Sequence, residues 1–315
     1  MVKKGVEHMK FLVFSDFHYY PNRYMNPGFE GLRKLQKAAE DAGCDMILQL
    51  GDFTHGPTTV KEFVDEYNNF HIPSYNCLGN HDTELCDVHE TIKAYKMPDV
   101  HYTLDIGGYR FIIVDTSYYF DGEKYQPYYQ ENYFAYPNTR ETLPPEEIAF
   151  IKESIETSPY PCIICSHASF ERYDDVTNRH LVTEIIDEAN RKKPLSVIMC
   201  MNGHRHKDHT SIINNVIYQE ITSPAFDCAS APPTPPHDKF KKEDYEEYRY
   251  AGWIICPNDI LYYIITLEGT TVTVEGSAPT TMYCGIGHKE LGMPEYDRMG
   301  RKYNPFVGSY KITLH

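Results

Sequence analysis

Short apolar runs alternate with segments of helical periodicity along most of the chain. The apolar runs have the length of buried strands and cover residues 10–16, 45–52, 72–82, 162–167 and 195–204. Apolar residues at helical spacing predict helices over residues 28–43, 59–70, 143–157 and 179–192. Turn-forming pairs predict hairpins at Gly107-Gly108, Asn214-Asn215 and Gly269-Thr270. We therefore expect a layered α/β domain.

Two segments depart from this alternation. Residues 117–139 are crowded with tyrosines, and residues 223–248 are rich first in proline and then in charge. Long irregular segments of compact domains often form lids, and a tyrosine ring can stack on a nucleobase or a sugar. We expect lid-like insertions at both places. Ordered surface loops whose aromatic rings pack down are the alternative.

Local signals add two further expectations. Thr59 and Glu62 have the spacing of a capping box at the start of the second predicted helix. Nine cysteines, several of them in apolar runs, indicate reduced core residues. Cys162 and Cys165 form a C-x-x-C inside a predicted strand, where their odd spacing places them on opposite faces. We therefore expect no shared metal and no disulfide between these two.

Composition restricts the classes of partner. The 315 residues suffice for one large domain or two small ones, and we take 1–315 as a single domain. The net charge of -15 repels phosphate backbones and anionic membranes, so neither nucleic acid nor a membrane is an expected partner. We find no apolar stretch of roughly 18 residues and no signal peptide pattern, and we expect a cytoplasmic protein.

Five of the predicted strands end in polar residues that bind metals or protons. These residues are Asp16, His18, Asp52, Asn80, His81, Asp82, His167, His204 and His206. The loops beyond the carboxyl ends of strands bind ligands in layered α/β folds. In extended chain, residues two apart point to one side, so His204 and His206 can converge, as can Asp16 and His18. A solvated polar turn is the alternative for an isolated pair of histidines.

The chemistry of this set is coherent. Carboxylate, amide oxygen and imidazole are ligands for Mn, Fe or Zn ions. Two such ions roughly 3.5–4 Å apart can clamp a phosphate and activate a water, and the two oxygens of Asp52 could bridge them. Glycines before Asp52, Asn80 and His204 would let the backbone turn sharply where each strand ends.

The blocks SDFH, LGDF, LGNHD, CSH and NGHRH follow one another between residues 15 and 206. In this order they resemble the calcineurin-like metallophosphoesterase superfamily. The resemblance implies a four-layer αββα sandwich, in which helices flank two mixed β-sheets. It also implies a site for two divalent or trivalent metal ions (Mn, Fe or Zn) at the strand ends.

The resemblance further implies a role for each residue. One metal would be held by Asp16, His18 and His206, the other by Asn80, His167 and His204, with Asp52 bridging the two. A hydroxide between the metals would attack phosphorus in line. His81 would protonate the leaving group or stabilise its developing charge, and Asp82 would orient His81. His167 has no motif of its own, and a hydrogen-bonded core histidine is the alternative there.

Departures from relatives narrow the expected substrates. Purple acid phosphatases of this superfamily carry tyrosine three residues after the bridging aspartate, where this chain has His55. The protein serine/threonine phosphatases carry arginine in two blocks that here read GDFTHGP and LGNHD, which disfavours a phosphoprotein substrate. We read three residues near the blocks, namely His55, Arg205 and Asp115, as structural, with contact to the substrate as the alternative, and His209 as part of a solvated loop.

The sequence thus predicts a metal-dependent phosphohydrolase acting on a small phosphorylated substrate. A phosphodiesterase is favoured slightly over a phosphomonoesterase, and a nucleotide is a possible substrate because of the tyrosines in residues 117–139. A binding scaffold that keeps the fold without the chemistry, or a nuclease of the same fold, is the alternative. The oligomeric state and the role of residues 277–315 stay open.

Overall fold

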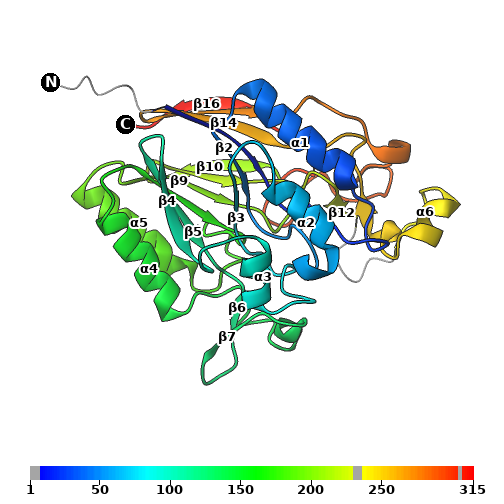
Figure 1. Cartoon of the computed structure of the whole chain (residues 1–315), viewed down its shortest axis with the longest axis horizontal. Helices are drawn as coiled ribbons and strands as arrows, with labels where there is room; N and C mark the ends of the chain where they lie inside the picture. The colour runs from blue at the N-terminus through cyan, green and yellow to red at the C-terminus, as the bar shows by residue number, and fades with distance from the viewer. Residues whose placement is uncertain (1–7, 230–235, 304–306) are drawn as a thin grey trace.

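Two six-stranded mixed sheets face each other, with helices on their outer sides (Figure 1). The computed structural model describes residues 8–229, 236–303 and 307–315. The rings of Phe11 and Phe111, one from each sheet, meet edge to face with centroids 5.3 Å apart. Side chains of both sheets form one buried core between them. The predicted four-layer αββα sandwich is confirmed.

The first sheet joins the start of the chain to its end. Its strands, in spatial order, are β16 (Tyr310–Thr313), β15 (Thr271–Gly276), β14 (Tyr263–Glu268), β1 (His8–Phe14), β2 (Met46–Gln49) and β3 (Ser74–Asn76). β1, β2 and β3 are parallel, and the other three are antiparallel. The tail without a sequence motif therefore supplies the edge strand β16.

The second sheet has a parallel centre and antiparallel edges. Its spatial order is β10 (His209–Ile213), β11 (Val216–Glu220), β9 (Val197–Asn202), β8 (Cys162–Ser166), β5 (Tyr109–Val114) and β4 (Tyr102–Ile106). The three predicted hairpins are confirmed, because they join β4 to β5, β10 to β11 and β14 to β15. His209 starts β10 and pairs with Glu220, so its assignment to a solvated loop was wrong.

Helices cover both outer faces. The α-helices of the described residues are α1 (Gly28–Ala42), α2 (Lys61–Asn68), α3 (Val88–Ala94), α4 (Pro145–Glu156), α5 (Arg179–Lys192) and α6 (Lys242–Glu247), of which α6 lies to one side of the sandwich and buries no residue of its own (Figure 1). α1 buries Leu32 and Leu35 in the core that includes the first sheet. α4 and α5 bury Ile151 and Val182 against the second sheet. No helix among the described residues is long and apolar enough to cross a membrane.

The capping box predicted at Thr59 is wrong. A 3-10 turn over Pro57–Val60 precedes α2, and the Thr59 hydroxyl donates to the carbonyl of Gly56, 2.7 Å away. The capping box in this region belongs instead to α3, where Asp87 and Glu90 exchange side-chain and backbone hydrogen bonds. The sequence analysis missed both α3 and the short α6.

Cys162 and Cys165 lie on opposite faces of their strand, as predicted, whereas Cys228 and Cys284 are exposed and not core residues. Cys162 packs into the core beneath α4 and α5, and Cys165 packs into the core between the sheets. All nine cysteines are free.

The two irregular segments contain small elements of their own. Residues 117–139 hold a hairpin of β6 (Tyr118–Phe120) and β7 (Tyr125–Pro127), followed by a 3-10 turn over Asn132–Ala135. Residues 223–248 hold β12 (Asp227–Cys228), which pairs with β13 (Ile254–Ile255), and α6. Part of that segment, residues 230–235, lies outside the described residues. Further 3-10 turns cover Ala251–Trp253 and Tyr283–Gly285.

Candidate metal centre

The polar residues that follow five strands meet at one end of the sandwich. Several of them have left-handed backbone, a conformation that costs non-glycine residues of order 1–3 kcal/mol and is concentrated at functional sites. These residues are Asp16 (φ 59°), His18 (φ 52°), Asp52 (φ 52°), His204 (φ 70°) and His206 (φ 52°). The extended-chain reasoning therefore does not describe how these pairs are placed.

Glycines bring the strand ends into close contact. A Cβ at Gly79 would lie 2.3 Å from Oδ1 of Asp52, and one at Gly203 would lie 2.4 Å from Oδ2 of Asp16. Of the three glycines expected to allow sharp turns, Gly51 has a left-handed φ of 97°. The other two are required because a side chain there would displace the carboxylates.

A first group joins Asp16, His18 and His206, as expected. Nε2 of His206 lies 3.3 Å from Oδ1 of Asp16 and 3.0 Å from Nε2 of His18. All three residues are buried, and one ligand atom from each lies within 4.8 Å of the others. The three side chains can hold one metal ion.

A second group joins Asp52, His167 and His204. Nε2 of His167 lies 3.1 Å from Oδ2 of Asp52 and 3.2 Å from Nδ1 of His204. The same Asp52 oxygen lies 3.8 Å from Nε2 of His18 in the first group. Asp52 therefore stands between the two groups, and His204 and His206 belong to different groups.

Asn80 presents a free amide oxygen. Its Nδ2 donates to the hydroxyl of Tyr133, 3.3 Å away. Its Oδ1 is buried and has no hydrogen-bond partner among the described residues, and the same is true of Oδ1 of Asp16. Two buried acceptor atoms without donors fit ligands of a cation.

Hydrogen bonds outside the site set the tautomers of three histidines. Nδ1 of His167 donates to the carbonyl of Leu50, and Nδ1 of His206 donates to that of Phe226, both over 2.8 Å. Nδ1 of His18 faces Nε2 of His55 at 3.2 Å. Since Nδ1 of His55 lies 2.8 Å from the Glu84 carboxylate, this chain of bonds places the His18 proton on Nδ1 as well.

Each of these three rings then turns the lone pair of Nε2 toward the carboxylates. A nitrogen lone pair repels a carboxylate oxygen 3.1 Å or 3.3 Å away unless a cation or a proton lies between the two atoms. Without a cation a proton takes this place on His167: although burial lowers its pKa, Asp52 and Asp16 raise the pKa to about 10, so a bound metal ion would displace that proton from Nε2. The donor set therefore fits metal ions.

His81 lies beside the bridging carboxylate. Its backbone N–H donates to Oδ1 of Asp52 over 2.7 Å, and its Nε2 lies 3.9 Å from Oδ2. Burial lowers the pKa of His81, but Asp52 and Glu84 outweigh burial and raise it to about 9. The Glu84 carboxylate at Nδ1 thus favours a protonated imidazole at this position.

The expectation that Asp82 orients His81 was wrong. Asp82 accepts the backbone N–H groups of Gly79 and Asp52 at 2.9 Å, and that of Thr54 at 3.0 Å. It therefore fixes the loop that presents Asp52. Nδ1 of His81 is bonded instead to Glu84, three residues along the chain.

Glu84 is a functional candidate that the sequence analysis did not single out. Its buried carboxylate also accepts from Nδ1 of His55 and Nη1 of Arg23, both at 2.8 Å. His55 is buried between this carboxylate and His18 and forms a third group of potential ligand atoms with His18 and His81, so its reading as structural stays a prediction. The separation of about 30 residues between Glu84 and His55 hides this link from any local motif.

Two further carboxylates lie near His204. Nε2 of His204 lies 3.5 Å from Oδ1 of Asp175 and 3.8 Å from Oε1 of Glu141. Arg205 binds Asp175 and the carbonyl of Asp174, so its structural reading fits these contacts. Asp115 accepts the backbone N–H of Ser117 over 2.8 Å and belongs to neither of the two groups.

A pocket of about 300 Å³ opens on the two groups. Beyond the site residues, its lining consists of Tyr24, Phe226, Cys228, Tyr250, Trp253 and Ile254. None of its described lining residues comes from 117–139. The tyrosines of that segment stack instead on one another, as Tyr128 does on Tyr133 with ring centroids 4.1 Å apart. The expectation that residues 117–139 supply the stacking surface is not supported by this arrangement.

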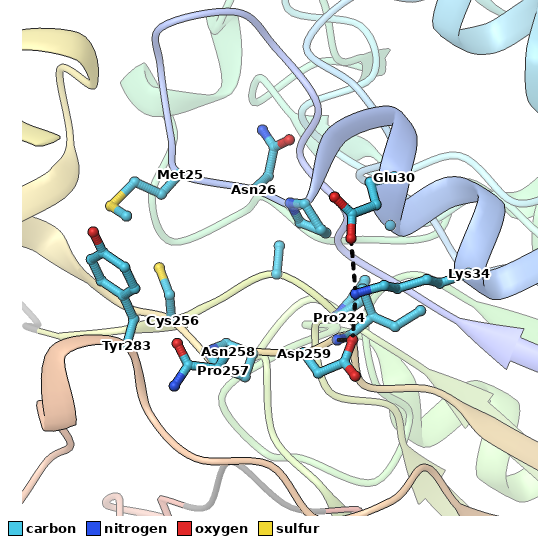
Figure 2. Close-up of a pocket in the computed structure, with 14 residues that line it drawn as sticks. Met25, Asn26, Glu30, Lys34, Pro224, Cys256, Pro257, Asn258, Asp259 and Tyr283 are labelled. Atoms are coloured by element: carbon cyan, nitrogen blue, oxygen red, sulfur yellow. Dashed lines mark hydrogen bonds and ion pairs between the residues drawn. The ribbon is translucent and has the colours of Figure 1, made fainter.

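A second pocket lies beside the start of α1 and holds none of the candidate metal ligands (Figure 2). Its volume is about 340 Å³. Figure 2 shows Lys34 between Glu30 and Asp259, with Nζ 3.2 Å and 3.1 Å from their carboxylates. Lys34 is thus occupied by two carboxylates of this pocket, whereas the pocket at the metal centre is lined by the candidate ligands His18, Asp52, His204 and His206.

Comparisons with known proteins agree with the fold. A dimetal phosphatase from Danio rerio aligns with a TM-score of 0.59 and 11% identity, covering 98% of this chain and 99% of its own. GAP50, described as the anchor in the inner membrane complex of Plasmodium, aligns with a TM-score of 0.56 and 11% identity, covering 98% and 89%. No curated protein sequence matches. The family model of the calcineurin-like phosphoesterases matches residues 9–208, and the chain belongs to this family of metal-dependent hydrolases.

Proposed function

We propose that this protein hydrolyses a phosphodiester of a small substrate with two metal ions, Mn, Fe or Zn. The proposed ligands are Asp16, His18 and His206 for one ion, Asn80, His167 and His204 for the other, and Asp52 for both. When bound, the ions supply Lewis acidity and an activated water for in-line attack on phosphorus.

One observation carries this proposal. Three histidine Nε2 atoms and two carboxylates converge, while hydrogen bonds outside the site hold the protons of the three rings on Nδ1. The hydrogen-bond network thus prepares the rings to bind cations before any cation arrives. Left-handed backbone at five of the seven proposed ligands indicates that the fold maintains this arrangement at a cost.

Three further residues assist the reaction, one on the substrate itself and two by positioning other side chains of the site. Nε2 of His81, on the Asp52 side, can donate its proton to the leaving oxygen. Glu84 holds Nδ1 of the same ring and keeps Nε2 directed at the site. Asp82 positions Asp52 through backbone hydrogen bonds.

The pocket favours a diester over a monoester. Beyond the site residues, its described lining carries no charged side chain. Arg23, whose guanidinium lies over the ring of the lining residue Tyr250, is bound by Glu84 and lies 3.6 Å from Glu131, and Arg205 is bound by Asp175. A monoester dianion would gain no further cation here, whereas a diester brings one charge and a second organic group that the apolar lining can bury.

The test compares two substrates on metal-stripped protein reloaded with Mn. We expect faster cleavage of bis-p-nitrophenyl phosphate than of p-nitrophenyl phosphate. Faster cleavage of the monoester would contradict the preference for diesters, but it would still agree with phosphoester hydrolysis at this site. The Asp52→Asn variant, measured in parallel, separates cleavage at this site from a contaminating phosphatase.

A binding scaffold is the second candidate, favoured by the structural similarity to GAP50, whose description is that of an anchor. Two bound metals without turnover of either substrate under Mn, Fe or Zn would support this candidate. A nuclease is disfavoured by the net charge of -15.

A further inference from the structure

The apolar wall of the pocket is tied to the metal centre by backbone hydrogen bonds. The Phe226 carbonyl accepts from Nδ1 of the proposed ligand His206. Next along the chain, β12 pairs with β13, and the Ala229 N–H donates to the carbonyl of Trp253 over 2.8 Å. The Trp253 N–H donates to Tyr250, whose own N–H donates to Arg23. The wall is therefore a built part of the site.

Most aromatic rings of this wall are already stacked. Tyr24 lies against Phe226 with centroids 4.9 Å apart, and against Tyr250 with centroids 5.1 Å apart. Arg249 and Arg23 lie over the ring of Tyr250 at 5.1 Å and 5.8 Å. These three rings support each other and have little free face left for a ligand.

Trp253 differs from its neighbours. It is the only tryptophan of the chain and is half-buried at the pocket. Its ring has no aromatic or cationic partner among the residues that the structure describes. An indole face held beside a phosphoesterase centre is a stacking surface for a planar group.

We propose that Trp253 binds an aromatic substituent that stays on the phosphorus of the substrate while the other ester group leaves, either a nucleobase or an aryl ring. The inference rests on the proposed function and names its substrate class. The substituent is neutral, because the described pocket lining beyond the site residues has no charged side chain to pair with it. It stacks on Trp253 while its phosphate lies at the proposed ligands His18 and His206, which line the same pocket.

The first experiment uses diesters that share one leaving group. We compare kcat/KM for methyl p-nitrophenyl phosphate, bis-p-nitrophenyl phosphate and thymidine 5′-p-nitrophenyl phosphate. Because all three carry the same p-nitrophenyl leaving group, the comparison isolates the substituent that stays on phosphorus, and stacking of that substituent predicts a preference of about 10-fold or more for thymidine or a second p-nitrophenyl group over methyl. The two aromatic diesters distinguish an aryl site from a nucleobase site, and equal rates on all three would overturn the inference.

Variants assign this preference to the indole. In Trp253→Leu the ratio of aromatic to methyl kcat/KM falls toward one, and Trp253→Phe, which keeps a ring, retains part of it. Tyr129→Leu, which removes a 42% exposed ring in residues 117–139, leaves the ratio unchanged. An unchanged ratio in a folded Trp253→Leu variant would contradict the proposal.

A binding measurement separates this inference from the proposed function. Because Trp253 is the sole tryptophan, its fluorescence reports on the pocket directly. With the Mn-loaded protein, phenylphosphonate quenches it saturably and methylphosphonate does not. Quenching without turnover of any diester would sink the proposed function and leave the stacking site standing. Turnover of diesters without quenching would overturn the stacking site alone.

Discussion

Two aromatic regions of this protein serve different purposes. The tyrosines of residues 117–139 bury their rings against each other, with Tyr119, Tyr128 and Tyr133 in one small cluster. The rings of Tyr24, Phe226, Tyr250 and Trp253 line the pocket at the metal centre. The first region stands out in the sequence by its many tyrosines, but it is the second region that lines the pocket. The second region is held against the metal centre by hydrogen bonds to the proposed ligands, such as the bond from Nδ1 of His206 to the carbonyl of Phe226.

The first region contacts the metal centre through one hydroxyl group. The hydroxyl of Tyr133 accepts from the amide of Asn80 and leaves the amide oxygen without a partner. The tyrosine cluster thus supports a proposed ligand from behind, while the other region forms the wall that meets the substrate. The predictions below separate these two roles, beginning with the largest effect.

The Asp52→Asn substitution removes one of the two negative charges shared between the histidine groups. We expect kcat to fall by about 1000-fold and one or both metals to be lost, because Asp52 is placed to hold both ions. Diester hydrolysis and metal content by mass spectrometry check this. Near wild-type turnover in the folded variant would show that the chemistry takes place elsewhere.

The Glu84→Gln substitution weakens the hold on Nδ1 of His81. We expect a loss of kcat of about 10- to 100-fold for diesters with poor, alkyl leaving groups. The loss should be much smaller for p-nitrophenolate, which leaves without a proton. A merely structural role would lower both rates equally. Glu123→Gln, in the exposed turn of the β6–β7 hairpin, is the matched control.

The Tyr133→Phe substitution removes the one hydroxyl that links the tyrosine cluster to Asn80. A hydrogen bond of about 1 kcal/mol corresponds to a loss of metal affinity of about 5-fold, with kcat nearly unchanged at saturating metal. Titration of the stripped protein with Mn measures this. A large loss of kcat at saturating metal would show that residues 117–139 contact the substrate after all.

The convergence of these strand-end residues could be predicted from the sequence because each block is local. Asp16 and His18 follow one strand, and His204 and His206 follow another, so short motifs record them. Their geometry could not be predicted, since the left-handed backbone at these residues is imposed by the packing of other loops.

Hydrogen-bond partners that lie far apart in the sequence could not be predicted from local motifs. Glu84 reaches His55, and His206 reaches Phe226, through contacts between separate loops. The same limit explains the wrong capping box, because Thr59 bonds to Gly56 in a turn that no helical pattern announces. For α3, by contrast, Asp87 and Glu90 carried a capping signal that could have been read from the sequence.

The most direct test of the central claim is the metal content of the purified chain. The protein is stripped, incubated with excess Mn, passed over a desalting column and analysed by plasma mass spectrometry beside the Asp52→Asn variant. The convergence of Asp16, His18 and His206 beside Asp52, His167 and His204 predicts two ions per wild-type chain. No retained metal, with diester hydrolysis undiminished by stripping, would contradict the account.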